Sequence, residues 1–175
     1  SLYLYQDSSG ARDCLSRHCG DHLEMSKSNN TVKMVDIRRK SVTLREALAE
    51  ARIHLQPKTL TLIREKKIPK GDVLAVATCA GILAAKKTDE LIPLCHPLPL
   101  ECVEIDFAFK KNGIIIKARC KTQAKTGVEM EAMAAVCMCA LTIYDMCKFT
   151  DKEAVIENIR LMEKRGGKSG SYKRK

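Results

Sequence analysis

Apolar residues recur with two different periods along this chain, which predicts a mixture of strands and helices. Over residues 102–110 apolar and polar side chains alternate, as in a strand with one buried face. Lys111-Asn112-Gly113 supplies a hairpin turn, and residues 114–122 form the expected returning strand. A further strand is expected over residues 155–163, and a short one over residues 34–37.

Helical spacing marks the stretch that begins at residue 43. Thr43 and Glu46 have the spacing of a capping box, in which a hydroxyl and a carboxylate three positions later satisfy the first backbone N–H groups of a helix. Apolar residues follow at intervals of three and four: Leu44, Ala47, Leu48, Ala51 and Leu55. We therefore expect a helix here that ends before Pro57, followed by a short helix or turn over residues 58–63.

Two more helices are predicted, and both are rich in apolar residues. Residues 73–87 are expected to form a mostly buried helix, with Asp72 as its N-cap. Thr126 and Glu129 repeat the capping-box spacing, and the helix behind them is expected to reach Phe149, a length of about 35 Å at about 1.5 Å per residue. An antiparallel hairpin combined with such helices predicts an α+β domain whose helices pack on one face of the sheet.

The two ends of the chain and one internal stretch lack this periodicity. Residues 1–33 are interpreted as a flexible N-terminal segment or interdomain linker, because Ser, Asn and Gly cluster there. Residues 92–99 contain three prolines, which fix φ and remove backbone donors, so a stiff loop is expected. Residues 166–170 form a Gly-rich loop, and residues 171–175 a basic tail.

Composition limits the classes of partner without selecting one. The chain has 175 residues and a net charge of +10, and such a surface attracts nucleic acid, anionic lipid or phosphorylated metabolites. Three Phe, four Tyr and no Trp argue against recognition of single strands by base stacking. No apolar run approaches the roughly 18 residues that would predict a membrane span.

The cysteines predict reduced thiols. There are nine of them, an odd number with no signal peptide, which indicates a reducing compartment. Cys14, His18, Cys19 and His22 are of the types that bind zinc, but their spacing is not that of a common zinc finger. A flexible tail is the favoured interpretation, and no metal site is predicted.

Two candidate sites lie on loops. Lys70 stands just before the N-terminus of a predicted helix, where free N–H groups and the helix dipole favour an anion; an ordinary solvated lysine is the alternative. Cys95 and His96 stand in the proline-rich loop. The imidazole can serve as acid, base or phosphate donor, or simply pack in the loop. Cys95 is a nucleophile only if its pKa is depressed, and a buried thiol is favoured.

Three further candidates are charged. Glu129 belongs to the capping box, whereas Glu131 does not; residues two apart on a regular helix point about 200° apart, so both are not expected to face one pocket. Asp145 and Lys148 have i,i+3 spacing and are expected to touch, as a surface ion pair or as a partly buried pair with shifted pKa values. Lys168 lies among glycines that let the backbone approach phosphate, although the pattern is not a Walker A loop.

The spacing of the acids on the long helix has a geometric consequence. Glu131 and Asp145 are 14 residues apart, which places them about 21 Å apart along a helix axis. One small molecule does not easily contact both in one chain. We therefore expect an active site at a subunit interface, where the start of one helix meets the end of its copy.

Five stretches, in this order, resemble the MoaC family of cyclic pyranopterin monophosphate synthases: KGDVLAVA, IPLCHPL, KTGVEMEA, ALTIYDMCK and GGKSG. The resemblance covers about residues 34–170 and implies a catalytic domain there with a ferredoxin-like fold. It implies a lyase that converts 3',8-cyclo-7,8-dihydroguanosine 5'-triphosphate into cyclic pyranopterin monophosphate and pyrophosphate without a redox cofactor. It does not decide whether a divalent ion accompanies the triphosphate.

The resemblance also implies roles for individual residues. Lys148 with Asp145 is expected to be the general acid–base pair, and Lys70, His96 and Lys168 to bind the phosphates. Glu129 and Glu131 are expected to hold the guanine-derived ring. The residues expected to be catalytic are Lys148, Asp145, Lys70 and Glu131, and those expected to bind substrate are His96, Cys95, Glu129, Met130 and Lys168.

Assembly and location follow from the same resemblance. Such enzymes form dimers that assemble into a hexamer, and a radical SAM cyclase supplies their substrate. The N-terminal segment and the many cysteines resemble the eukaryotic version, in which this domain can follow a radical SAM domain in one chain. Residues 1–33 would then be interdomain linker, and a mitochondrial matrix location is implied.

Two other classes of function compete with this interpretation. A basic nucleic-acid-binding module accounts for the net charge, but carboxylates at positions 129, 131 and 145 among the lysines repel a phosphate backbone. A non-catalytic assembly protein would use the long helix for oligomerisation alone. Turnover of the cyclic nucleotide with release of pyrophosphate distinguishes an enzyme from both.

Overall fold

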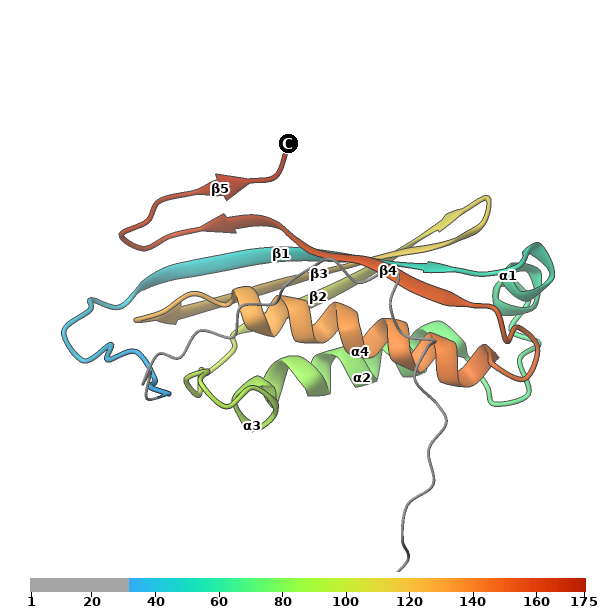
Figure 1. Ribbon diagram of the computed structural model, residues 1–175, viewed down its shortest axis with the longest axis horizontal. Coiled ribbons are helices and arrows are strands. Elements are labelled where there is room, and N and C mark those ends of the chain that lie inside the picture. Colours follow the sequence, from blue (N-terminus) through green and yellow to red (C-terminus); the bar gives the residue numbers. More distant parts are fainter. Residues whose placement is uncertain (1–31) are drawn as a thin grey trace, which may run out of the picture. The chain divides into compact units, whose positions relative to one another are not determined.

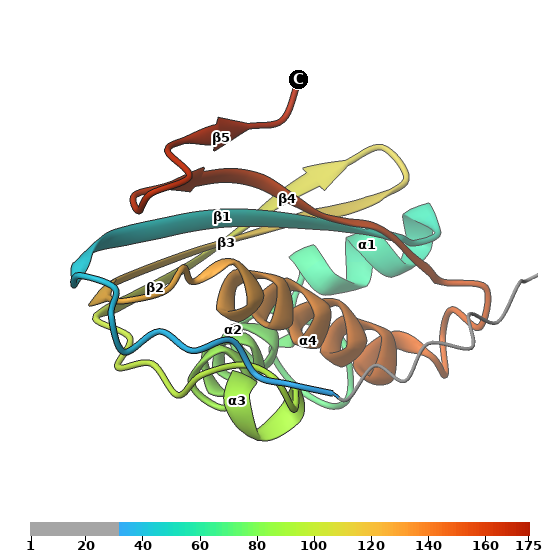
Figure 2. The same ribbon diagram turned by 60° about the vertical axis from the view of Figure 1, so that its left-hand side comes forward.

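In the part of the chain that the structure describes, five antiparallel strands form one sheet, and the helices lie on one of its faces (Figures 1 and 2). The computed structural model describes residues 32–175. The elements are β1 (Thr43–His54), α1 (Pro57–Arg64), α2 (Val73–Lys86), α3 (Thr88–Leu91), β2 (Cys102–Lys110), β3 (Gly113–Ala124), α4 (Glu129–Cys147), β4 (Val155–Arg165) and β5 (Tyr172–Lys173). The strand order is β2-β3-β1-β4-β5, so each helical connection between β1 and β2 and between β3 and β4 skips one strand. This is the predicted α+β, ferredoxin-like arrangement.

The predicted helix at residues 43–55 is wrong, because these residues form the central strand β1. Every residue of β1 pairs with β3, from Thr43 opposite Ala124 to His54 opposite Gly113, and β4 pairs along the other edge of β1. The buried positions follow a period of two: Ala47, Ala49, Ala51 and Ile53 are at most 1% exposed. Helix propensity is a weak prior, and the ladders on both edges outweigh it.

Small side chains let α4 pack closely on the sheet. The inner face of β3 is buried at every second residue, and α4 lies across it and across the alanines of β1 (Figure 1). By length and composition α4 would also suit a membrane span. Its apolar character is accounted for by burial, because half of that stretch lies inside the fold.

The predicted N-terminal cap is confirmed for helix α2 and wrong for helix α4. The backbone N–H of Ala75 donates to Asp72 Oδ1 at 3.1 Å, which confirms Asp72 as the N-cap of α2. Helix α4 begins only at Glu129 and carries no side-chain cap, so the second capping box is wrong. It ends at Cys147, two residues before the predicted end.

Of the smaller predictions, some are confirmed and others are wrong. The hairpin of β2 and β3, the loop at residues 92–99 and the strand β4 are confirmed. Residues 34–37 are not a strand, and the predicted basic tail contains the short strand β5. Residues 1–31, which include Cys14, His18, Cys19 and His22, lie outside the described residues.

Candidate functional site

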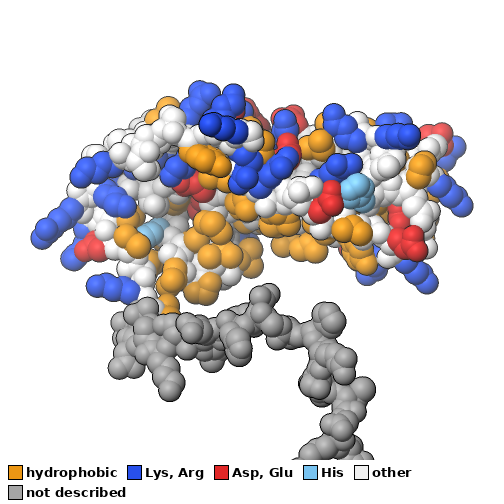
Figure 3. Space-filling model, turned by 45° about the horizontal axis from the view of Figure 1, so that its top comes forward, with side chains coloured by type: hydrophobic (Ala, Val, Ile, Leu, Met, Phe, Trp, Pro, Cys, Tyr) orange, Lys and Arg blue, Asp and Glu red, His pale blue; other side chains and the backbone are white. Residues whose placement is uncertain are grey.

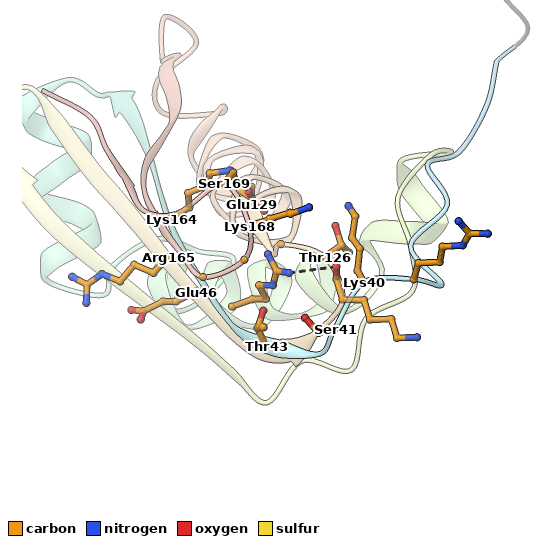
Figure 4. Close-up of a pocket in the computed structure, with 16 residues that line it drawn as sticks. Lys40, Ser41, Thr43, Glu46, Thr126, Glu129, Lys164, Arg165, Lys168 and Ser169 are labelled. Atoms are coloured by element: carbon orange, nitrogen blue, oxygen red, sulfur yellow. Dashed lines mark hydrogen bonds and ion pairs between the residues drawn. The ribbon is translucent and has the colours of Figure 1, made fainter.

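A cavity of about 710 Å³, called here the basic cavity, opens where the start of β1, the loop before α4 and the end of β4 meet (Figure 4). Its charged lining is mostly cationic: Arg39, Lys40, Arg45, Lys125, Lys164, Arg165 and Lys168, against Glu46 and Glu129. The remaining lining is Ser41, Thr43, Thr126, Gly127, Gly166, Gly167 and Ser169. Such a concentration of positive charge suits a multiply charged anion.

Lys164 supplies a cation that the sequence did not indicate. Its Nζ lies 3.1 Å from Glu129 Oε1, and both side chains are about 30% exposed. Glu129, the first residue of α4, folds back over Gly127, where an added Cβ would fall within 2 Å of the carboxylate. One signal was available: Lys164 stands two positions before the Gly-rich loop, which begins at Gly166.

Arg45 joins the two loops that line the basic cavity. Its guanidinium donates to the carbonyls of Ala124 and Lys125, each at 3.4 Å. On the other side it lies against Gly167, where an added Cβ would be 1.7 Å from Arg45 Nη1. The sequence prediction missed Arg45 because it placed this residue in a helix. Only as part of the strand β1 does its side chain reach the Gly-rich loop.

A second cavity of about 330 Å³, called here the apolar pocket, adjoins the basic cavity. The two share Lys40, Thr126, Gly127 and Glu129. The rest of its lining is Val35, Ile37, Leu94, Cys95, His96, Leu98, Met130 and Glu131. The structure therefore brings together five of the predicted residues: Cys95, His96, Glu129, Met130 and Glu131.

Glu129 and Glu131 both face this pocket, contrary to the prediction from helical spacing. The prediction assumed a regular helix through both residues, but Glu129 is the first helical residue and its side chain folds back. Glu131 is only 4% exposed. Burial raises its pKa to about 7, with a lesser contribution from Glu129 and Asp89, while its own backbone N–H opposes the shift.

Cys95 is not set up as a nucleophile. Burial raises the pKa of its thiol, and the charges of Glu131 and Asp89 raise it further. A thiolate is the reactive form, so this position is expected to shape the pocket and not to attack a substrate.

The remaining predicted residues form a separate cluster at the far end of α4. Asp145 accepts from two ammonium groups, with Lys148 Nζ 2.8 Å from Oδ1 and Lys70 Nζ 2.7 Å from Oδ2. The hydrogen bonds from Lys148 and then Lys70 lower the pKa of Asp145 to about 2. These side chains are about half exposed, so the partly buried pair considered from the sequence is an exposed one.

Within one chain the cluster and the two cavities stay apart. Glu131 and Asp145 occupy the same straight helix, about 21 Å apart along its axis. Lys168 lines the basic cavity. A ligand in the cavities therefore reaches Glu131 and Lys168 but not Lys148 of the same chain.

Comparison with known proteins gives the family of this chain. Residues 34–167 match the MoaC family. A cyclic pyranopterin monophosphate synthase of Brevibacillus brevis is 53% identical over 155 residues, which cover 88% of this chain and 97% of that protein. One from Novosphingobium aromaticivorans is 55% identical over 146 residues, covering 83% and 93%. The chain belongs to the MoaC family.

Proposed function

We propose that this chain is a cyclic pyranopterin monophosphate synthase of molybdenum cofactor biosynthesis, a lyase acting on 3',8-cyclo-7,8-dihydroguanosine 5'-triphosphate with release of pyrophosphate. The observation that carries the proposal is the pairing of the two cavities. A cation-lined cavity shares a wall with a smaller apolar pocket that holds two carboxyl groups. A nucleotide-derived ligand has the matching halves, a polyphosphate and a ring with N–H groups.

The triphosphate is assigned to the basic cavity. Lys168, Arg45 and Lys164 approach it from three segments, and the adjoining Ser and Thr hydroxyls supply neutral donors. Charge-assisted hydrogen bonds of this kind are among the stronger ones in proteins. Lys164 is already paired with Glu129, so phosphate binding would weaken the contact between these two side chains.

The ring is assigned to the apolar pocket. Leu94, Leu98 and Met130 cover its faces, while Glu129 and Glu131 offer oxygen atoms to its polar edge. His96 lies at the same pocket and is placed to reach the sugar or the first phosphate. This division matches the ring-binding role expected of the two glutamates.

Lys70, Asp145 and Lys148 are assigned to the site of a second copy. Asp145 stays ionised and holds both ammonium groups, which orients Lys148 for proton transfer at the ring. An antiparallel pairing of two α4 helices would bring this cluster to the Glu131 end of the partner. Exposed apolar side chains on α2 and α4 support such a contact: Val76, Leu83 and Leu141 are each more than 40% exposed. Apolar side chains also gather in the middle of the face in Figure 3.

The direct test is turnover. Purified protein is incubated with the cyclic nucleotide, and pyrophosphate release and pterin formation are followed together. Both products at equal amounts are expected. Binding to DNA or RNA that weakens steeply with salt, without turnover, would instead favour the nucleic-acid-binding alternative.

Substitution of Gly167 tests the phosphate assignment. Gly167→Ala should weaken binding of inorganic triphosphate by about tenfold, because the new Cβ would displace the Arg45 guanidinium and cost a charge-assisted contact. Isothermal titration calorimetry measures the affinity.

Gly170→Ala is the matched control for this substitution. Gly170 also has a positive φ, +69° against +80° at Gly167, but its added Cβ would meet no atom of residues 32–175 within 4 Å. Backbone strain is thus similar in the two variants, and only Gly167→Ala creates the clash. Equal affinities for both would place triphosphate outside the basic cavity.

Assembly, location and cofactor use extend the proposal. A hexamer built from dimers, substrate supply by a radical SAM cyclase, catalysis without a redox cofactor and a mitochondrial matrix location remain predictions from the family resemblance. The family match begins at residue 34, and the assignment of residues 1–33 as a flexible segment or interdomain linker is a further prediction. Mass measurement of the intact assembly tests the hexamer.

A further inference from the structure

We propose that Thr122 is a positioning residue, whose hydroxyl holds the proline-rich loop so that His96 faces the apolar pocket. The proposal rests on the function proposed above and adds a residue that touches neither cavity. Thr122 lies on β3 and is fully buried. Its Oγ1 donates to the carbonyl of Pro99 at 2.5 Å, across 23 residues of sequence.

The loop between α3 and β2 has few hydrogen bonds of its own. Cys95 N–H donates to the Ile92 carbonyl at 3.0 Å, and Glu101 N–H to the Lys121 carbonyl at 3.0 Å. Between these points residues 96–100 make no backbone–backbone hydrogen bond to any described residue. Pro97 and Pro99 have no N–H to offer. The hydrogen bond from the Thr122 hydroxyl is therefore the polar contact that holds the part of the loop that follows His96.

This hydrogen bond can control the orientation of the loop as well as its attachment to the sheet. Leu98 and Leu100 pack on the core, which holds the loop near the sheet without fixing its rotation. A hydrogen bond to the Pro99 carbonyl is directional and sets the orientation of the neighbouring peptide groups. His96 and Leu98, which precede Pro99 in the chain, line the apolar pocket. Rotation of this segment would move the imidazole before it detached the loop.

Valine and serine at position 122 separate orientation from simple packing. Thr122→Val keeps the side-chain shape and removes the hydroxyl, whereas Thr122→Ser keeps the hydroxyl. Thr122→Val is expected to raise KM for the cyclic nucleotide about fivefold while kcat changes less than twofold, because His96 is assigned to binding. Thr122→Ser should stay within about twofold of wild type in both constants.

A double-substitution cycle with His96→Ala tests whether Thr122 acts through His96. In the His96→Ala background, Thr122→Val should cause no further loss of kcat/KM, since residues acting through one group are not additive. If Thr122→Val lowered kcat/KM as much in this background as in the wild-type chain, Thr122 would be a structural residue that does not act through His96. An unchanged KM in Thr122→Val would overturn the proposal while leaving the proposed function intact. Absence of turnover in wild type would overturn both.

Folding of the valine variant is checked by its thermal midpoint. If Thr122→Val does not fold, Thr122→Ala takes its place in the same cycle, because alanine also removes the hydroxyl and adds no side-chain volume. The Thr122→Ser chain is then the reference for retained hydroxyl function. Either variant gives the same pair of decisive results.

Discussion

Mixing chains that carry Glu131→Ala with chains that carry Lys148→Ala should restore about a quarter of the wild-type turnover, although each variant alone should be almost inactive. Glu131 and Lys148 lie at opposite ends of α4, and the proposed site combines one end from each of two copies. Random pairing makes about half of all dimers mixed, and each mixed dimer has one intact site. Turnover of co-expressed or co-refolded chains measures the restoration.

The structure also supplies the control for this experiment. Lys70 and Lys148 both bind Asp145, so they belong to the same end of α4. Chains with Lys70→Ala mixed with chains with Lys148→Ala should regain nothing, because every site then lacks one of the two lysines. Restoration in this control, or none in the Glu131 and Lys148 mixture, would contradict a site shared between copies.

Replacing Glu131 by glutamine should stabilise the fold at pH 8 while impairing the enzyme. Burial raises the pKa of Glu131 in the folded state to about 7, above its ordinary value of 4.5. The folded state therefore holds its proton where the unfolded state has lost it, and stability falls as pH rises from about 4.5 to about 7. Across that window the loss is roughly 3 kcal/mol, since one pKa unit corresponds to about 1.4 kcal/mol.

The Glu131→Gln chain should escape this loss, because the amide does not ionise. Urea unfolding at pH 5 and pH 8, at one fixed protein concentration, measures the free energy of unfolding of each chain. Glu129→Gln is the matched control: Glu129 is partly exposed and paired with Lys164, so its replacement should bring no gain at pH 8. The same pH dependence in wild type and Glu131→Gln would show that cations compensate the buried carboxylate in the assembled protein.

Several local features could be predicted from the sequence because short-range chemistry decides them. Asp72 caps α2 because its carboxylate accepts from the backbone N–H of Ala75, only three residues later in the chain. Alternation over β2 and the Asn112-Gly113 turn define a hairpin whose two strands are adjacent in sequence. The contact of Asp145 with Lys148 follows from helical geometry alone.

Features that depend on distant partners were not predictable in this way. The residues of β1 carry both helical and alternating patterns, and only pairing with β3 and β4 selects the strand. Lys70 meets Asp145 across 75 residues, and Arg45 meets Gly167 only once β1 and β4 are neighbours.

By itself, then, the sequence determined the α+β class, the hairpin, the capped helix α2 and the five motifs that indicate the family. Tertiary structure decided that residues 43–54 form the central strand, that Glu129 and Glu131 share one pocket, and that Arg45 and Lys164 join Lys168. The physical reason is the range of the interactions. Caps, turns and i,i+3 pairs are satisfied within a few residues, whereas sheet order and cavity walls exist only after segments far apart in the chain have packed together.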